Sequence, residues 1–169
     1  DINDDLVDDY VIGTPNYTAQ VEVNGKTKKL AKAGKVELFS GKTGELLWAR
    51  EGSAKQQLFG SAIASGSIPG DEYIDIAIGA PGANKKTGEV FSCYFDVEDD
   101  QVACLEEHVF TPDESFKGSL YGSSVAIAEG IGLFVGAPKA KNLSADSMSV
   151  AEPLLNKAVG AVLLYPAAN

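Results

Sequence analysis

The sequence predicts an all-β protein made of β-propeller blades, and two observations lead to this prediction. A glycine-centred turn recurs behind a β-branched apolar run, as Ile12-Gly13-Thr14-Pro15, Ile78-Gly79-Ala80-Pro81 and Val135-Gly136-Ala137-Pro138. The three central glycines lie 66 and 57 residues apart, and each unit then continues with a strand that begins at a glycine. A period of this length, built only of strands and turns, is typical of propeller blades.

The strands are expected in the same order in each unit. Apolar runs bounded by glycine and proline predict strands at Tyr10–Gly13, Ile74–Gly79 and Gly132–Gly136. Because these runs are apolar throughout, we expect them to be buried on both faces, near the axis of the ring. Gly-led and outer strands follow at Gly34–Phe39, Glu45–Arg50, Gly88–Phe95, Cys104–Phe110 and Gly160–Tyr165. The blade units are about 1–57, 58–119 and 120–169, with a short helical turn at most in Ser144–Pro153.

Two units share a further prelude, Phe59-Gly60-Ser61 and Tyr121-Gly122-Ser123. A Phe-Gly pair followed by a Gly-Ala-Pro turn resembles the FG-GAP repeat in the propeller of integrin α subunits. Similar repeats form the C-terminal propeller of glycosylphosphatidylinositol-specific phospholipase D. The resemblance implies a seven-bladed ring, of which this chain supplies about three blades, the first and last incomplete. Because raw blade edges expose backbone and apolar faces, we expect the remaining blades to come from another chain or a cleaved precursor.

The composition argues against two classes of partner. The chain has 14 basic and 24 acidic residues, and its net charge of −10 disfavours binding to nucleic acid. No apolar run approaches the roughly 20 residues of a transmembrane segment.

Two cysteines and two sequons predict a protein that is secreted or lies on the extracellular face of the cell surface. With a hairpin tip at Val97–Asp100, Cys93 and Cys104 lie directly opposite each other, as a disulfide requires. Two reduced core thiols are the alternative. Asn16 and Asn142 begin glycosylation sequons on expected loops, so we expect a glycoprotein.

The first nine residues predict a structural calcium site. They place oxygen-bearing side chains at positions 1, 3, 5 and 9, and Ca²⁺ prefers six to eight oxygen ligands. The segment resembles the calcium loop of integrin-type blades, except that Leu6 stands where the family often has glycine. The resemblance implies that the ligands are Asp1, Asn3, Asp5, the carbonyl of Val7, and Asp9. A solvated acidic turn is the alternative.

Lysines collect in the loops expected on the opposite face of the disc. Asn24-Gly25 within 16–33 predicts a protruding β-hairpin, and long loops on a rigid scaffold often bind partners. We expect this face to contact a protein ligand, an anionic glycan or a lipid headgroup, with lysine-rich solvated loops as the alternative. Its candidate residues are Lys26, Lys28, Lys29, Lys32, Lys85, Lys86, Lys139 and Lys141.

The sequence shows no catalytic site. Ser40–Thr43 lacks the first glycine of a phosphate-binding loop and is interpreted as a turn. The single histidine, His108, is interpreted as a surface or interblade residue. Two functions remain: a calcium-stabilised extracellular propeller for protein or cell-surface interaction, non-catalytic in itself, or the non-catalytic propeller of a secreted hydrolase resembling the phospholipase named above.

Overall fold

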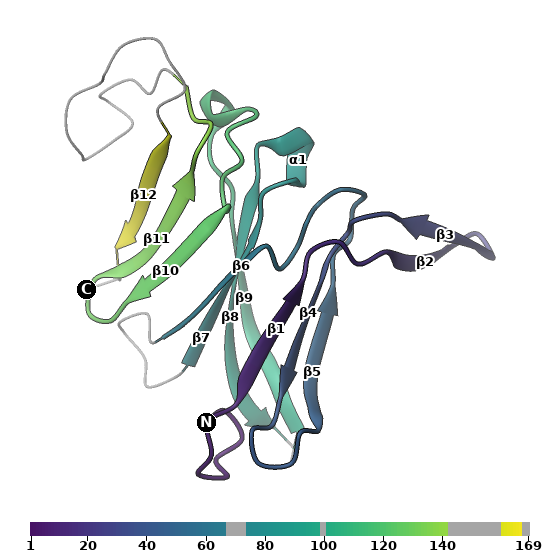
Figure 1. Cartoon of the computed structure of the whole chain (residues 1–169), viewed down its shortest axis with the longest axis vertical. Helices are drawn as coiled ribbons and strands as arrows, with labels where there is room; N and C mark the ends of the chain where they lie inside the picture. The colour runs from purple at the N-terminus through teal and green to yellow at the C-terminus, as the bar shows by residue number, and fades with distance from the viewer. Residues whose placement is uncertain (67–73, 99–100, 142–159, 167–169) are drawn as a thin grey trace.

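A computed structural model of the chain describes residues 1–66, 74–98, 101–141 and 160–166 (Figure 1). The predicted all-β class is confirmed, because the described residues lie mainly in antiparallel sheets, with one helical turn at α1 (Ala83–Lys86) and another at η1 (Glu114–Phe116). The arrangement is compatible with a partial β-propeller. The predicted turn in 144–153 and the sequon at Asn142 lie outside the described residues.

Three antiparallel sheets of the described residues follow the order of the repeats. The first sheet contains β1 (Tyr10–Thr14), β4 (Lys35–Phe39) and β5 (Leu46–Glu51). The middle sheet contains β6 (Ala62–Gly66), β7 (Ile74–Ala80), β8 (Glu89–Glu98) and β9 (Gln101–Phe110). The third sheet contains β10 (Ser124–Ala128), β11 (Gly132–Ala137) and β12 (Ala161–Pro166). A separate hairpin joins β2 (Ala19–Val23) to β3 (Lys26–Leu30).

The glycines of the repeat hold neighbouring sheets against each other. A Cβ atom on Gly79 of the middle sheet would lie 2.0 Å from the carbonyl oxygen of Gly122, which precedes the third sheet. A Cβ on Gly13 of the first sheet would lie 2.2 Å from the carbonyl oxygen of Gly60, which precedes the middle sheet. Only glycine permits this approach. Each interface therefore joins two glycines of the repeat. One lies in a Gly-Ala-Pro turn or its Gly-Thr-Pro counterpart, and the other lies in the next Phe-Gly or Tyr-Gly pair.

Each of these two interfaces encloses its own core. Ile76 and Ile78 of β7 pack towards the first sheet, together with Phe59. Residues of the opposite face of the middle sheet pack towards the third sheet in a second cluster around Tyr121. The same parallel backbone bridge closes both interfaces, between Gly34 and Phe59 and between Gly88 and Tyr121.

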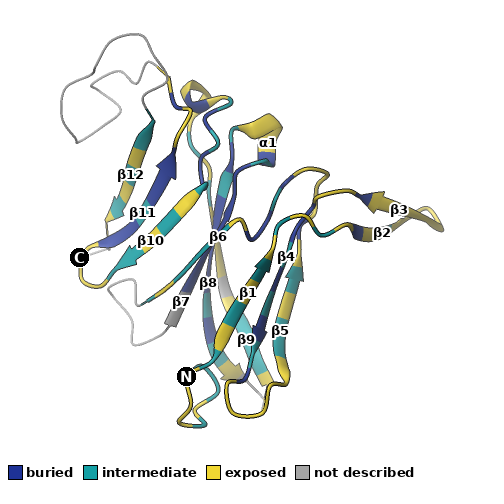
Figure 2. Cartoon of the chain, viewed as in Figure 1, coloured by how far each residue is buried: buried dark blue, intermediate teal, exposed yellow. Residues whose placement is uncertain are grey.

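The prediction that the apolar runs are buried on both faces is right for two strands and wrong for β1. Five of the six residues of β11 and all described side chains of β7 are buried, whereas β1 alternates between exposed and half-buried residues (Figure 2). Tyr10 is 45% exposed and Ile12 is 46% exposed. Val11 packs against the core shared with the middle sheet, so its neighbours Tyr10 and Ile12 lie on the opposite face of β1, which no further sheet of the described residues covers.

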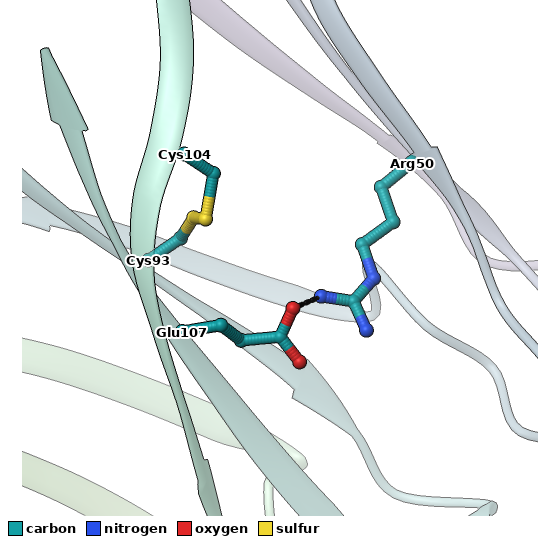
Figure 3. Close-up of a disulfide and its surroundings, with 4 residues drawn as sticks. All are labelled: Arg50, Cys93, Cys104 and Glu107. Atoms are coloured by element: carbon teal, nitrogen blue, oxygen red, sulfur yellow. Dashed lines mark hydrogen bonds and ion pairs between the residues drawn. A yellow bond between two sulfur atoms is a disulfide. The ribbon is translucent and has the colours of Figure 1, made fainter.

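The predicted register of the cysteine hairpin is also wrong. Val97 pairs with Val102, so the centre of the hairpin lies one residue nearer the C-terminus than direct opposition of the cysteines predicts. In this register Cys104 pairs with Phe95, and a further shift of one residue between Tyr94 and Phe95 pairs Cys93 with Glu107. The two cysteines are instead diagonal neighbours on one face, and a disulfide joins them with a Cα–Cα distance of 5.7 Å (Figure 3).

Candidate functional site

The acidic loop, Asp1–Asp9, folds around its own side-chain oxygens. Asp1 accepts hydrogen bonds from the backbone N–H groups of Asp5 at 3.0 Å and Leu6 at 2.8 Å. Asn3 Oδ1 accepts from the same N–H of Asp5 at 3.2 Å, so oxygens of two predicted ligands meet at one backbone nitrogen. Asp9 Oδ2 accepts from the N–H of Ile2 at 2.7 Å, which brings the end of the loop back to its start.

Two residues of the loop adopt the left-handed backbone conformation that makes this tight path possible. The φ angle is 56° at Asp4 and 69° at Leu6. Leu6 is 93% exposed, so its side chain gains little from packing. A β-carbon in this conformation is strained, and glycine adopts it without that cost. Leu6, where integrin-type loops often have glycine, is therefore a left-handed position in this chain.

The turn between β4 and β5 supports the acidic loop from outside. The hydroxyl of Ser40, a residue only 1% exposed, donates to Asp5 Oδ2 at 3.2 Å. The N–H of Gly41 donates to Asp9 Oδ1 at 3.1 Å, and Lys42 Nζ donates to the carbonyl of Asp5 at 3.1 Å. The sequence predicts only a turn at this segment. Its contact with residues more than 30 positions away has no local sequence signal beyond the repeat topology, which places both loops at one end of the blade.

The donor set of the acidic loop fits calcium by its chemistry. It consists of oxygens alone, with carboxylates on Asp1, Asp5 and Asp9 and an amide on Asn3, as Ca²⁺ prefers. An oxygen that accepts one backbone hydrogen bond retains a second lone pair for a cation. For Val7 the structure gives a bond from its N–H to Asp5 Oδ1 at 3.0 Å, and the role of its carbonyl stays a prediction.

This arrangement is not a finished coordination shell. Among the residues that the structure describes, no group of three or more His, Cys, Asp or Glu side chains has the arrangement of a metal site. The carboxylates converge on backbone N–H groups instead. The calcium ligands and the solvated acidic turn therefore remain the two interpretations of this loop.

The lysines of the predicted partner face lie at the end of the molecule opposite the acidic loop. The β2–β3 hairpin, the helical turn α1 and the segment that follows β11 all lie at that end (Figure 1). The lysines that these segments carry are exposed, namely Lys26, Lys28, Lys29, Lys32, Lys85, Lys86, Lys139 and Lys141. Backbone bonds fix two of these segments to the next blade, from Leu58 N–H to the carbonyl of Lys32 and from Leu120 N–H to the carbonyl of Lys86.

The other two polar candidates lie on the surface. Asn16, which begins the first sequon, is exposed in the turn after β1. His108 is exposed on β9, where its ring lies 6.4 Å from that of Phe110.

An interblade contact that the sequence analysis missed involves Arg50. Its guanidinium forms an ion pair with Glu107 of β9 (Figure 3) and lies 5.5 Å from the centroid of the Phe59 ring and 4.8 Å from that of Phe91. Arg50 and Glu107 are 57 positions apart, so no local pattern indicates the pairing. The contact holds the outer strands of two blades together and has no substrate-binding geometry of its own.

Part of the chain is similar in sequence to a known protein. An 88-residue segment is 36% identical to integrin alpha-PS2 of Drosophila melanogaster, which covers 48% of the chain and 6% of the length of that integrin. No family model matches the chain. Among the helices of the described residues, none is long and apolar enough to cross a membrane.

Proposed function

We propose that the chain is part of an extracellular β-propeller that serves as an interaction module for proteins or cell surfaces and has no catalytic role of its own. The observation that carries the proposal is the 36% identity to an integrin α chain over 88 residues. The repeated glycine interfaces and the Cys93–Cys104 disulfide agree with it, because disulfides persist in oxidising compartments. No observation favours the phospholipase alternative.

Calcium is the structural cofactor of this proposal. Asp1, Asn3, Asp5 and Asp9 would hold it through side-chain oxygens, and Val7 through its carbonyl. Bound Ca²⁺ would neutralise the clustered carboxylates and so fix the loop. Ser40 positions Asp5, and the N–H of Gly41 positions Asp9, so the turn between β4 and β5 holds two of the ligands in place.

Further blades cover the open faces of the first and third sheets in this proposal. Tyr10 and Ile12 of β1 leave one apolar face exposed, and Val162 and Leu164 of β12 leave another. The equivalent residues of the middle sheet are buried by neighbouring blades. The natural particle, weighed intact by native mass spectrometry, is expected to contain more polypeptide than these 169 residues.

Attachment of cells to surfaces coated with the chain, in calcium and in EGTA, tests the interaction role. We expect attachment in calcium that falls when the basic end is reversed at Lys85→Glu, Lys86→Glu and Lys139→Glu. Glu129→Lys is the control, because Glu129 is exposed in the turn between β10 and β11 and lies outside the acidic loop. Attachment no greater than on a bare surface, or unaffected by the triple reversal, contradicts the proposal.

A further inference from the structure

The β2–β3 hairpin projects from the first blade as a ribbon with free edges (Figure 1). Its two strands pair with each other, and within the described part of the chain no other strand pairs with them. Asn24 and Gly25 have φ angles of 53° and 71°, as in a type I′ turn of two residues. In such a hairpin the two residues that flank the turn, Val23 and Lys26, are hydrogen-bonded to each other. Bonded and non-bonded pairs alternate along the strands, so the backbone N–H and C=O groups of Thr27 point away from β2.

The base of the ribbon is fixed, so its outer edge is presented in a defined direction. Ala19 and Leu30 are buried at its root. The N–H of Gly34 donates to the carbonyl of Tyr17 at 3.1 Å. The Tyr17 hydroxyl also bonds the carboxylate of Glu51, which raises the pKa of that tyrosine and ties the root to β5. Two strands are marginal alone, and these contacts are what keeps the ribbon ordered.

The charge on this ribbon is one-sided. Lys26, Lys28 and Lys29 are exposed on β3, and none of them forms an ion pair with a described residue. The acid on β2, Glu22, accepts a bond from the Thr27 hydroxyl at 2.5 Å. Lysines on a free strand edge oppose pairing with neutral or basic strands. An acidic strand removes that penalty, because opposite charges on neighbouring strands attract.

We infer that the outer edge of β3 binds an extended acidic segment of a partner protein by strand addition. The inference rests on the proposed interaction role and names the partner chemistry for one part of the basic end. The backbone of the segment pairs with the outward N–H and C=O groups of Thr27 and Lys29. Glutamate or aspartate at alternate positions then lies beside Lys26 and Lys28, because alternate residues share a face of the ribbon.

The test uses the 169-residue chain and a fluorescent seven-residue peptide in which glutamate and valine alternate. Binding is followed by fluorescence anisotropy, and backbone amides are followed by hydrogen exchange. We expect the amides of Thr27 and Lys29 to gain protection, while those of Gln20 and Glu22 on the other edge do not. Reversal at Lys26→Glu and Lys28→Glu is expected to weaken binding at least about tenfold. The matched reversal at Lys55→Glu and Lys117→Glu, exposed lysines outside β2 and β3, is expected to change binding less than about twofold.

Strand addition and simple charge attraction give different results. A peptide of the same composition with its glutamates in one block, or one N-methylated at alternate amides, is expected to lose binding. Equal binding of these peptides, or absence of protection at Thr27, overturns the inference. So does preferred binding of heparin or anionic vesicles at the hairpin. If the alternating peptide fails while calcium-dependent cell attachment persists, the hairpin inference alone is wrong; loss of attachment by the unmodified chain contradicts the proposed function itself.

Discussion

Ile78 on β7 and Ile12 on β1 occupy the same position of the repeat, yet their environments differ. Ile78 is 1% exposed because the first sheet covers it, whereas Ile12 is 46% exposed. On the other side of the blades, Val36 and Val90 are fully buried, and their counterpart Val162 is 59% exposed. The motif therefore specifies the strand and its turn, and burial depends on the next blade.

Gly79→Ala and Gly136→Ala place the same methyl group at equivalent positions of two blades. At Gly79 the new Cβ meets the backbone oxygen of Gly122 at 2.0 Å, so the sheets must separate. We expect a loss of about 3 kcal/mol in the free energy of unfolding. At Gly136 the nearest atom is the Ser124 hydroxyl, which can rotate away, so the loss is expected to be below about 1 kcal/mol. Urea unfolding measures both, and equal losses contradict the assignment of Gly79 to an interface.

Ile78→Val and Ile12→Val compare a covered face with an open one. Removal of one methylene from buried Ile78 is expected to cost about 1 kcal/mol, and the same change at Ile12 close to nothing. If further blades cover β1 in the complete particle, Ile12→Val should cost as much there as Ile78→Val. Thermal unfolding of the chain and of the complete particle gives the comparison. An unchanged effect of Ile12→Val in the particle means that the face of β1 stays open.

Tyr121→Phe tests the interface between the middle and third sheets. The Tyr121 hydroxyl is hydrogen-bonded to that of Tyr165 at 2.8 Å, and its loss is expected to cost about 1 kcal/mol at neutral pH. Burial, together with this bond, raises the pKa of Tyr121 above its ordinary value of 10.0. Below pH 10.0 the stabilisation is fully present; above it the unfolded chain loses the proton first, so stability falls. The variant is expected to lose less stability between pH 9 and 11 than the unmodified chain, with exposed Tyr10→Phe as control.

Leu6→Gly is expected to have the smallest effect without metal and a larger one with it. Relief of the left-handed conformation at φ 69° is expected to stabilise the chain by about 0.5 kcal/mol, because the greater freedom of unfolded glycine offsets part of the gain. If the loop binds calcium, the same change should also raise its affinity for calcium. Calorimetric melting with calcium and with EGTA measures both. A melting temperature that calcium leaves unchanged in both proteins favours the solvated acidic turn.

The sequence predicts the strand order well because the relevant information is local. Glycines at fixed positions mark the turns, and the strands that contain Gly79 and Gly136 lie where the repeat places them. The hairpin at Asn24-Gly25 is found for the same reason. The exposure of β1 could not be predicted. An apolar run indicates that a strand has side chains to bury, but it does not indicate whether this chain supplies the sheet that buries them.

The parts of the site that were missed depend on distant residues or on backbone irregularity. The hairpin is centred one residue beyond the position at which the cysteines would be opposed, so they are diagonal instead, and nothing in their spacing reveals it. The bond from Ser40 to Asp5 spans 35 positions, and the one between Tyr121 and Tyr165 spans 44. Such contacts follow from the packing of loops and blades and are not encoded in any window of sequence.

The pairing of Gly79 with Gly122 bears on how such chains change in length over evolution. Each repeat contacts the preceding repeat through its Phe-Gly or Tyr-Gly pair. It contacts the following repeat through the glycine of its Gly-Ala-Pro turn. Duplication of one whole repeat therefore creates one complete new junction and leaves the existing junctions unchanged. Insertion of a partial repeat separates the two halves and leaves a gap. Gene duplication at the repeat boundary is thus the step that the packing of these glycines tolerates.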